Sequence, residues 1–176
     1  TKGIDNAVPT AFHTTGSGIA GHYFAGHYDV GFWKTQDYGA SWVNKNPVFP
    51  GWNGYGGSVT GIIPAENSVT VATMASSSKT DADSGNVYLY SIWRSTDFGN
   101  SWAVYRTGLP YTGFLYGLSR DPGNDRLWLT RDGYVYTSTD AGVSWTSASL
   151  VGLPVDGGLY VAQAKNGVVL VGGTHG

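Results

Sequence analysis

The chain of 176 residues is 41% hydrophobic and 14% aromatic, which is enough for one domain with a sizeable core. Its 27 glycines and its low charged fraction of 12% favour tight turns and half-buried strands over surface helices. The net charge of −2 excludes a basic surface for nucleic acid or anionic lipid, and the absence of cysteine excludes disulfides and thiolate metal sites.

The sequence also argues against a membrane as a partner. No run approaches the roughly 18 consecutive apolar residues of a membrane helix, and residues 1–6 lack the apolar core of a signal peptide. We therefore expect the chain to begin in mature, soluble sequence, as a processed product or as a piece of a longer protein.

Alternating apolar and polar residues predict strands along much of the chain. In chain order, they cover residues 69–73, 126–131 and 134–137, each with one buried face. Residues 158–163 and 167–171 predict two further strands. No segment has the pattern of a helix, so the fold class is predicted to be all-β.

One pattern occurs three times and determines the predicted organisation. It places Ser or Thr, Asp, Gly, Ser and Trp at fixed spacing in residues 35–42 (TQDYGASW), 95–102 (STDFGNSW) and 138–145 (STDAGVSW). Such an Asp accepts hydrogen bonds from amides of its own turn, while the Gly two residues later supplies a positive φ. Each segment is therefore predicted to be a stiff hairpin between two strands of one sheet.

Each hairpin is flanked by aromatic residues at fixed positions. The residue four before each Asp is expected on the incoming strand, and the final Trp is expected on the outgoing strand. The incoming residues are Trp33, Trp93 and Tyr136.

The repeated pattern resembles the Asp-box of sialidase-like and xyloglucanase-like β-propellers. The resemblance implies a partial β-propeller of about three and a half four-stranded blades, as one incomplete domain over residues 1–176. Blade-like repeats are expected at about residues 10–50, 55–108 and 112–150, with a half blade at 155–176. Closed propellers have about four to eight blades, so the remainder is expected from the same polypeptide or another chain.

The spacing of the repeats predicts one insertion. The Asp positions are separated by 60 residues and then by 43, and about 40–45 residues is usual for a four-stranded blade. The first interval is therefore expected to carry an insertion, at residues 76–85 or at residues 50–57. Either segment could overhang a binding face.

The Asp-box residues are predicted to be structural. The aspartates fasten the turns, the glycines permit the turns, and the tryptophans pack inside each blade. These residues are Asp37, Gly39 and Trp42, then Asp97, Gly99 and Trp102, then Asp140, Gly142 and Trp145.

Residues 2–8 (KGIDNAV) and 26–32 (GHYDVGF) resemble a stretch in the second propeller of the endo-xyloglucanases of glycoside hydrolase family 74. In that family a Gly-Ile-Glu-Glu-like segment precedes a Gly-Asp-x-Gly-Gly-Phe-like motif, and Asp29 matches the motif aspartate. The resemblance implies that Asp29 is one of two catalytic carboxylates and that the second belongs to the other propeller. The alternative is that Asp29 caps a turn before a strand over residues 30–33.

The resemblance also implies the chemistry and the substrate. Such enzymes cleave β-linked glucans with inversion, with one carboxylic acid and one carboxylate about 6.5–9.5 Å apart. Flat aromatic rings cover the apolar faces of sugars, and five aromatic residues lie outside the repeated positions in Gly-rich segments. The predicted substrate-binding residues are Trp52, Tyr55, Tyr111, Phe114 and Tyr116.

No cofactor or metal is expected. His22 and His27 are five residues apart, and an alternating strand would direct them to opposite faces. Sialidase chemistry needs an arginine cluster and a tyrosine with an acidic partner, and the only glutamate, Glu66, lies in a turn-like segment.

Three hypotheses of function remain open. The first, which we favour, is a secreted, extracellular xyloglucanase-like glycoside hydrolase, with Asp29-dependent activity on a β-glucan polysaccharide. The second is a carbohydrate-binding propeller without catalysis, whose binding survives Asp29→Asn. The third is a structural module that completes a ring or fibre with identical chains and has no affinity for sugars.

Overall fold

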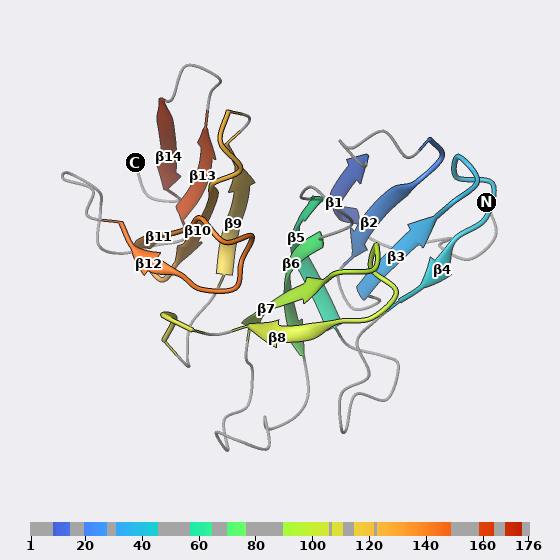
Figure 1. Ribbon diagram of the computed structural model, residues 1–176, viewed down its shortest axis with the longest axis horizontal. Coiled ribbons are helices and arrows are strands. Elements are labelled where there is room, and N and C mark those ends of the chain that lie inside the picture. The colour runs from blue at the N-terminus through green and yellow to red at the C-terminus, as the bar shows by residue number, and fades with distance from the viewer. Residues whose placement is uncertain are drawn as a thin grey trace.

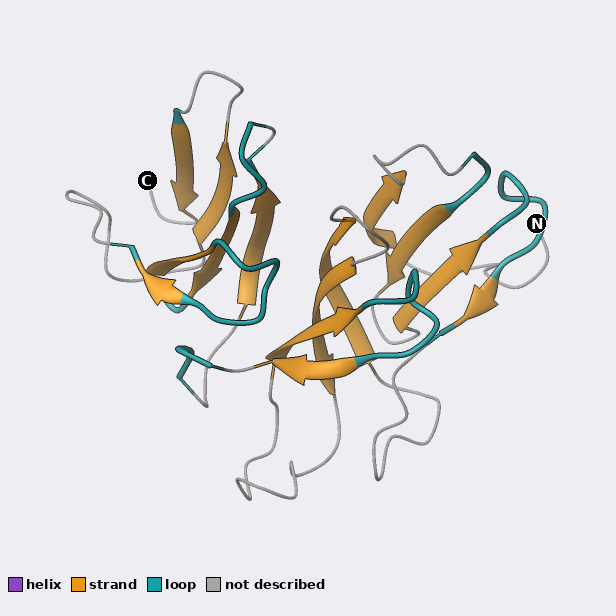
Figure 2. Ribbon diagram, in the orientation of Figure 1, coloured by secondary structure: helices purple, strands orange, loops and turns teal. Residues whose placement is uncertain are grey.

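The structure is a computed structural model that describes residues 9–14, 20–27, 31–45, 57–64, 70–76, 90–105, 107–110, 115–121, 123–148, 159–163 and 168–173. Within these ranges it consists of strands and turns and contains no helix, which confirms the predicted all-β class (Figure 2). None of these residues therefore belongs to a helix long and apolar enough to cross a membrane.

The strands form antiparallel sheets in which neighbours in sequence are neighbours in space (Figure 1). Sheet 1 contains β1 (Pro9–Thr14), β2 (Tyr23–His27), β3 (Gly31–Thr35) and β4 (Val43–Asn44). Sheet 2 contains β5 (Gly57–Pro64), β6 (Thr70–Ser76), β7 (Tyr90–Ser95) and β8 (Ala103–Tyr105). Sheet 3 contains β9 (Leu115–Arg120), β10 (Leu127–Arg131), β11 (Tyr134–Ser138) and β12 (Thr146–Ser147). Sheet 4 contains only β13 (Leu159–Gln163) and β14 (Val169–Gly173) in the described residues.

Three four-stranded sheets and a two-stranded one confirm the predicted three and a half blades. The strands predicted from alternation correspond to β6, β10, β11, β13 and β14. The two segments predicted to hold the insertion lie almost entirely outside the described residues.

The prediction of one buried face is wrong for β10, where all five residues are buried. Leu127 and Leu129 join a core with sheet 2, whereas Trp128 packs on the other side with residues of β14. Both faces are buried because sheet 3 lies between two other sheets.

The hydrophobic cores lie between sheets. Phe24 and Phe32 of sheet 1 pack against Val59, Ile62 and Trp93 of sheet 2. A second cluster joins sheets 2 and 3 and consists of Ile63, Ile92, Leu115, Leu127, Leu129, Tyr136 and Trp145. A third cluster joins sheets 3 and 4 and consists of Trp128, Val135, Val169 and Val171.

The first strands of consecutive sheets contact one another and run in the same direction. The hydroxyl of Thr60 in β5 donates to the carbonyl of Leu115 at 3.3 Å, and Arg120 at the far end of β9 donates to the carbonyl of Pro64 at 3.5 Å. In Figure 1, the arrows of β1, β9 and β13 also point the same way. The sheets therefore follow one another along an arc, with β1 towards one end and β14 towards the other.

This arrangement defines two rims. The three repeat segments connect the third and fourth strands of sheets 1, 2 and 3 at one rim, which we call the turn rim. Because the strands are antiparallel, the second and third strands are connected at the opposite rim, as between His27 and Gly31. The chain also passes from one sheet to the next at the opposite rim.

Candidate functional site

Each repeat segment forms a turn closed by its aspartate. In the first turn, the amide of Ser41 donates to Oδ1 of Asp37 at 2.9 Å and the Ser41 hydroxyl donates to Oδ2 at 2.6 Å. The hydroxyl of Thr35 donates to Oδ1 of Asp37 at 2.6 Å and accepts the amide of Gly39 at 3.0 Å. The corresponding atoms of the second and third turns make the same four hydrogen bonds.

The turns contain two consecutive left-handed residues. The glycines at this position have φ values of 89°, 72° and 83°, as the sequence pattern predicts for Gly39, Gly99 and Gly142. The residue before each glycine is also left-handed, with φ of 58° at Tyr38, 56° at Phe98 and 54° at Ala141. Sequence reasoning missed this second position, because side chains other than glycine adopt it at a cost of about 1–2 kcal/mol.

The hydrogen bonds keep the turn carboxylates ionised. Hydrogen bonds from Ser41 and then Thr35 lower the pKa of Asp37 to about 2. Partial desolvation acts to raise the pKa of Asp97, but the hydrogen bonds from Ser101, Ser95 and Asn100 together outweigh it and lower this pKa to about 2. Asp140 has a lowered pKa for the same balance of reasons.

The tryptophans that end the second and third turns pack between sheets, not inside one blade as predicted. The ring of Trp102 lies edge-on to Phe32 of sheet 1, with centroids 4.7 Å apart, and its Nε1 donates to the carbonyl of Lys45 at 2.9 Å. Trp145 is buried in the cluster that contains Ile92 of sheet 2. Each of the three tryptophans lies just before the outgoing strand, one residue earlier than expected.

One cation links the second turn to sheet 1, and another links the third turn to sheet 2. The ammonium group of Lys34 in β3 donates to the carbonyl of Phe98 at 3.2 Å and to Oδ1 of Asn100 at 2.7 Å. Arg94 in β7 donates through Nε to the carbonyl of Ala141 at 3.0 Å. Both cations lie three residues before the aspartate of their own sheet, a regularity in the sequence that could have identified them.

Lys34 is the more deeply buried of these two cations. Only 3% of its side chain is exposed, and burial is the main cause that lowers its pKa. Its hydrogen-bond acceptors on the second turn replace water around the ammonium group, so this lysine holds sheets 1 and 2 together.

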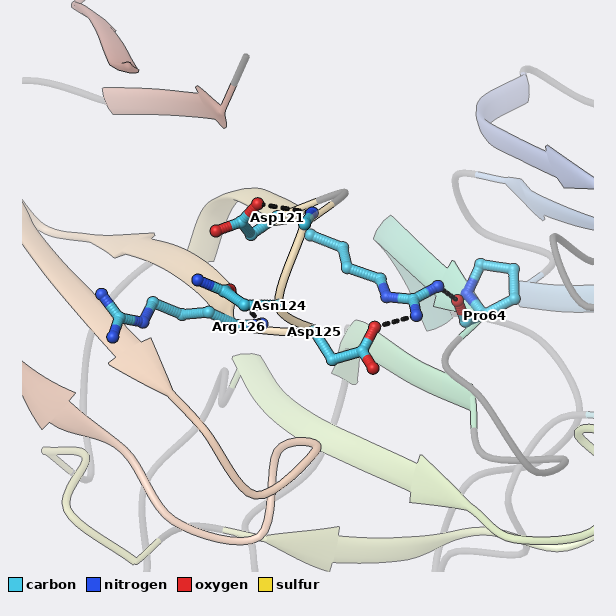
Figure 3. A network of polar contacts seen from close by, with 7 residues as sticks. Pro64, Asp121, Asn124, Asp125 and Arg126 are labelled. Carbon is cyan, nitrogen blue, oxygen red and sulfur yellow. Dashed lines mark hydrogen bonds and ion pairs between the residues drawn. The ribbon is translucent and has the colours of Figure 1, made fainter. Parts of the chain in front are cut away.

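A separate set of polar contacts at the turn rim joins sheet 3 to sheet 2 (Figure 3). Arg120 forms an ion pair with Asp125 and also donates to the carbonyl of Pro64 in β5. Within the same loop, Oδ1 of Asp121 accepts the amide of Gly123 at 2.8 Å, and Asn124 accepts the amide of Arg126 at 3.1 Å. These groups stabilise the loop between β9 and β10 and its contact with sheet 2.

The predicted catalytic residue, Asp29, lies outside the described residues, but the strands on either side of it are described. β2 ends at His27 and β3 begins at Gly31, and these two residues are paired across the antiparallel ladder. Gly31 has a positive φ of 78°, and His27 is only 4% exposed. Asp29 thus belongs to a three-residue connection that begins and ends at the opposite rim.

Four of the five predicted sugar-binding aromatics belong to chain segments that also start and end at this rim. Trp52 and Tyr55 occur between β4 and β5, and Tyr111 and Phe114 occur between β8 and β9. These four residues lie outside the described residues. Tyr116 is the second residue of β9, where only its backbone is described.

Other polar residues at the opposite rim were not singled out by sequence reasoning. Arg131, at the end of β10, is buried, and Asp132 follows it in the turn to β11. His22, considered as a metal ligand from the sequence, precedes β2 rather than lying within it, so it lies at the turn rim, where its ring centroid is 6.0 Å from that of Phe98. Within the described ranges, no three His, Cys, Asp or Glu side chains are grouped so that they could hold a metal ion.

Comparisons with known proteins identify the fold. No family model and no curated protein matches the chain. The extracellular domain of BT4673 from B. thetaiotaomicron is similar with a TM-score of 0.66 and 17% identity, over 99% of this chain and 20% of that chain. YCF48 from Cyanidioschyzon merolae is similar with a TM-score of 0.61 and 12% identity, over 97% of this chain and 51% of that chain.

A third similar structure is the GH74 xyloglucanase from Xanthomonas campestris, with a TM-score of 0.53 and 17% identity, over 78% of this chain and 22% of that chain. The chain thus spans about half the length of YCF48 and about a fifth of the other two structures. Similarity at these identities shows the fold, and the fold is that of a partial β-propeller.

Proposed function

We propose that the chain is part of an extracellular propeller that acts on a β-glucan polysaccharide, as an inverting glycoside hydrolase of the xyloglucanase type. The observation that carries this proposal is the common rim. Asp29 follows β2 and precedes β3, and the aromatic segments follow β4 and β8 and precede β5 and β9. All of these strand termini lie at the opposite rim. The similarity in fold to a GH74 xyloglucanase supports the same choice.

The proposed chemistry needs two carboxylates. Asp29 supplies one of them, and a second part of the assembly supplies the other at about 6.5–9.5 Å, which leaves room for the attacking water. The aromatic rings form subsites that cover the apolar faces of the sugars. They are Trp52, Tyr55, Tyr111, Phe114 and Tyr116.

The repeat-turn residues have a structural role in this proposal. The carboxylates of Asp37, Asp97 and Asp140 accept hydrogen bonds from their own turns, at the rim opposite the one where β2 ends and β3 begins. Carboxylates held in this way stay ionised and fixed, which suits them to fastening a hairpin and not to transferring a proton.

A second candidate function is glycan binding without catalysis. The pairing of His27 with Gly31 across a connection of three residues describes a tight hairpin, and Gly31 has the left-handed φ typical of such hairpins. Aspartate commonly stabilises turns of this kind, which would make Asp29 structural. The aromatic subsites would then bind the polysaccharide alone.

The test is the release of reducing ends from xyloglucan and from mixed-linkage glucan, after the mass of the native assembly has been measured. Wild-type protein is compared with Asp29→Asn and with Asp132→Asn. Asp132 is a matched control because it is an exposed aspartate at the same rim and has a φ of 45°, which asparagine tolerates. We expect the first variant to lose at least about 100-fold in rate, as for a lost general acid or base.

The outcomes separate the two candidates. Activity that depends on Asp29 and not on Asp132 supports the hydrolase. Binding of xyloglucan without hydrolysis, retained in Asp29→Asn, supports the glycan-binding module. The absence of both binding and hydrolysis in a correctly folded assembly contradicts both candidates.

A further inference from the structure

The connection between β10 and β11 has in sheet 3 the place that the connection between β2 and β3 has in sheet 1. Both connections join the second strand of their sheet to the third strand at the opposite rim. The last pair of the ladder before the connection is Arg131 with Tyr134 in sheet 3. The corresponding pair in sheet 1 is His27 with Gly31. Tyr134 is therefore the counterpart of Gly31, which follows the connection that contains Asp29.

Tyr134 lies on the side of sheet 3 that is directed at sheet 2. Because side chains alternate along a strand, Tyr134 shares one face of β11 with Tyr136. Tyr136 is buried in the core that joins sheets 2 and 3. Tyr134 therefore lies at the end of this core, on the same side of sheet 3 as sheets 1 and 2.

A row of three residues crosses sheet 3 at the opposite rim. Leu115 of β9 pairs with Arg131 of β10, and Arg131 pairs with Tyr134 of β11. Leu115 is 1% exposed and Arg131 is 3% exposed, whereas Tyr134 is 59% exposed. Leu115 and Arg131 thus close the core at this end, and the tyrosine ring remains at the surface.

The fold does not require an aromatic ring at this position. The counterpart in sheet 1 is a glycine, and the strands pair there without a side chain. In the described ranges, Tyr134 is also the only exposed large apolar side chain at the opposite rim. The others lie within strands or at the turn rim, and they are Phe12, Tyr38, Val43, Val143, Val168 and Leu170.

An exposed tyrosine on a fixed strand is well suited to binding a sugar. Its flat ring covers the apolar face of a pyranose, and its hydroxyl is free to form hydrogen bonds at the edge of the contact. Tyrosine has few rotatable bonds, so little conformational entropy is lost when the ring is immobilised. The ladder between β10 and β11 holds the backbone of Tyr134 in place before any ligand binds.

We propose that Tyr134 is a further sugar-binding residue of the β-glucan site, on sheet 3. This inference rests on the proposed function and adds a described residue to its five predicted aromatics. Sheet 2 lies between sheet 1 and sheet 3, so the sugar on Tyr134 is distant from the bond that is cleaved beside Asp29. Packed sheets are about 10 Å apart, which gives about 20 Å between the two positions. The ligand is therefore a long glucan that follows the opposite rim over several sugar units.

The test is the dissociation constant of xyloglucan polymer, measured by titration calorimetry on the native assembly. All proteins carry Asp29→Asn, so that the polymer is not cleaved during the titration. Tyr134→Ala is expected to weaken binding about 10-fold, as for the loss of one aromatic contact. Tyr134→Phe keeps the ring and is expected to bind within about 2-fold of the parent protein.

Tyr38→Ala is the matched control. Tyr38 is 69% exposed, but it lies at the turn rim. Alanine is compatible with its backbone, because Ala141 has the same position in the third turn with a φ of 54°. This variant is expected to bind xyloglucan like the parent protein. Thermal unfolding of every variant checks that the sheets still form.

Hydrolysis by the protein that retains Asp29 gives a second readout. Tyr134→Ala is expected to raise KM about 10-fold and to leave kcat unchanged, because a sugar distant from the cleaved bond is bound equally in the ground state and in the transition state. A lower kcat would place the ring at the cleaved bond and would overturn the position proposed for it. For an assembly that binds without hydrolysis, the calorimetric titration decides alone.

The outcomes separate this inference from the function on which it rests. If Tyr134→Ala binds as tightly as the parent protein, or if Tyr38→Ala weakens binding equally, Tyr134 is not part of the site, and the proposed function stands. If neither the parent protein nor the wild-type protein binds xyloglucan, the proposed function fails, and this inference fails with it.

Discussion

The first and second repeat turns share four hydrogen bonds but have different surroundings. Tyr38 of the first turn is 69% exposed, whereas Phe98 at the same position of the second turn is half-buried and packs against a core. Trp42 contacts the exposed Phe12, whereas Trp102 contacts Phe32 of the preceding sheet. The comparison shows that the residues of the turn are sufficient to form it. Packing against a preceding sheet is a separate contribution, which the second turn has and the first turn lacks.

The largest expected difference between the two turns is in their glycines. A Cβ at Gly99 would lie 2.8 Å from Cε1 of Phe32, whereas a Cβ at Gly39 would lie 3.8 Å from Nε1 of Trp42, at ordinary contact distance. Both have a positive φ, so Gly39→Ala is expected to cost about 1–2 kcal/mol of unfolding free energy and Gly99→Ala about 2–5 kcal/mol. Urea unfolding measures both values, and equal losses would contradict the role of packing at Gly99.

The tryptophans give a smaller difference. Trp102→Ala removes the contact with Phe32 and the hydrogen bond to Lys45, and we expect a loss of about 2–3 kcal/mol because the ring is half-buried. Trp42→Ala is expected to cost less than about 1 kcal/mol, because its ring contact in the described residues is with the exposed Phe12. Trp102→Phe keeps a ring but loses the indole donor, so it is expected to lose about 1 kcal/mol. A loss as large as that of Trp102→Ala would contradict the expectation that the ring contact contributes the larger part.

The smallest expected difference concerns pH, because the aspartates of both turns have a pKa of about 2. This folded value lies below the ordinary value of 3.8, so their stabilisation is present above about pH 4 and is lost as the pH falls towards 2. Asp37→Asn and Asp97→Asn should each flatten the fall in unfolding free energy over this range, by a similar amount. Chemical unfolding at a series of pH values measures the slope, and an unchanged slope in either variant would contradict the assignment for that turn.

The sequence was sufficient to predict the parts of the fold that depend on neighbouring residues. The three turns, the strands beside them and the number of sheets all follow from patterns within a few positions, as in the glycine two residues after each aspartate. Contacts between sheets were not predicted. Lys34 and Asn100 are separated by 66 positions and Trp102 and Lys45 by 57, so no local pattern identifies them as partners.

The candidate site stays a prediction for a similar reason. Asp29 and four of the five aromatic residues lie outside the described residues. A motif identifies the residue types at a site, but the distances between side chains depend on how separate connections approach one another. The common rim follows from strand order alone, and it is therefore the part of the site that sequence and topology together support.

The direction of the contacts between sheets has a consequence for how the chain folds during synthesis. The second and third turns pack against the sheet that precedes them in the sequence, through Lys34 and Phe32 or through Arg94 and Ile92. A ribosome releases the N-terminal part first, and folding can begin on that part while the rest is still being made. Each newly released sheet therefore meets a surface that has already formed, and the last aromatic residue of its turn can pack as soon as it leaves the exit tunnel.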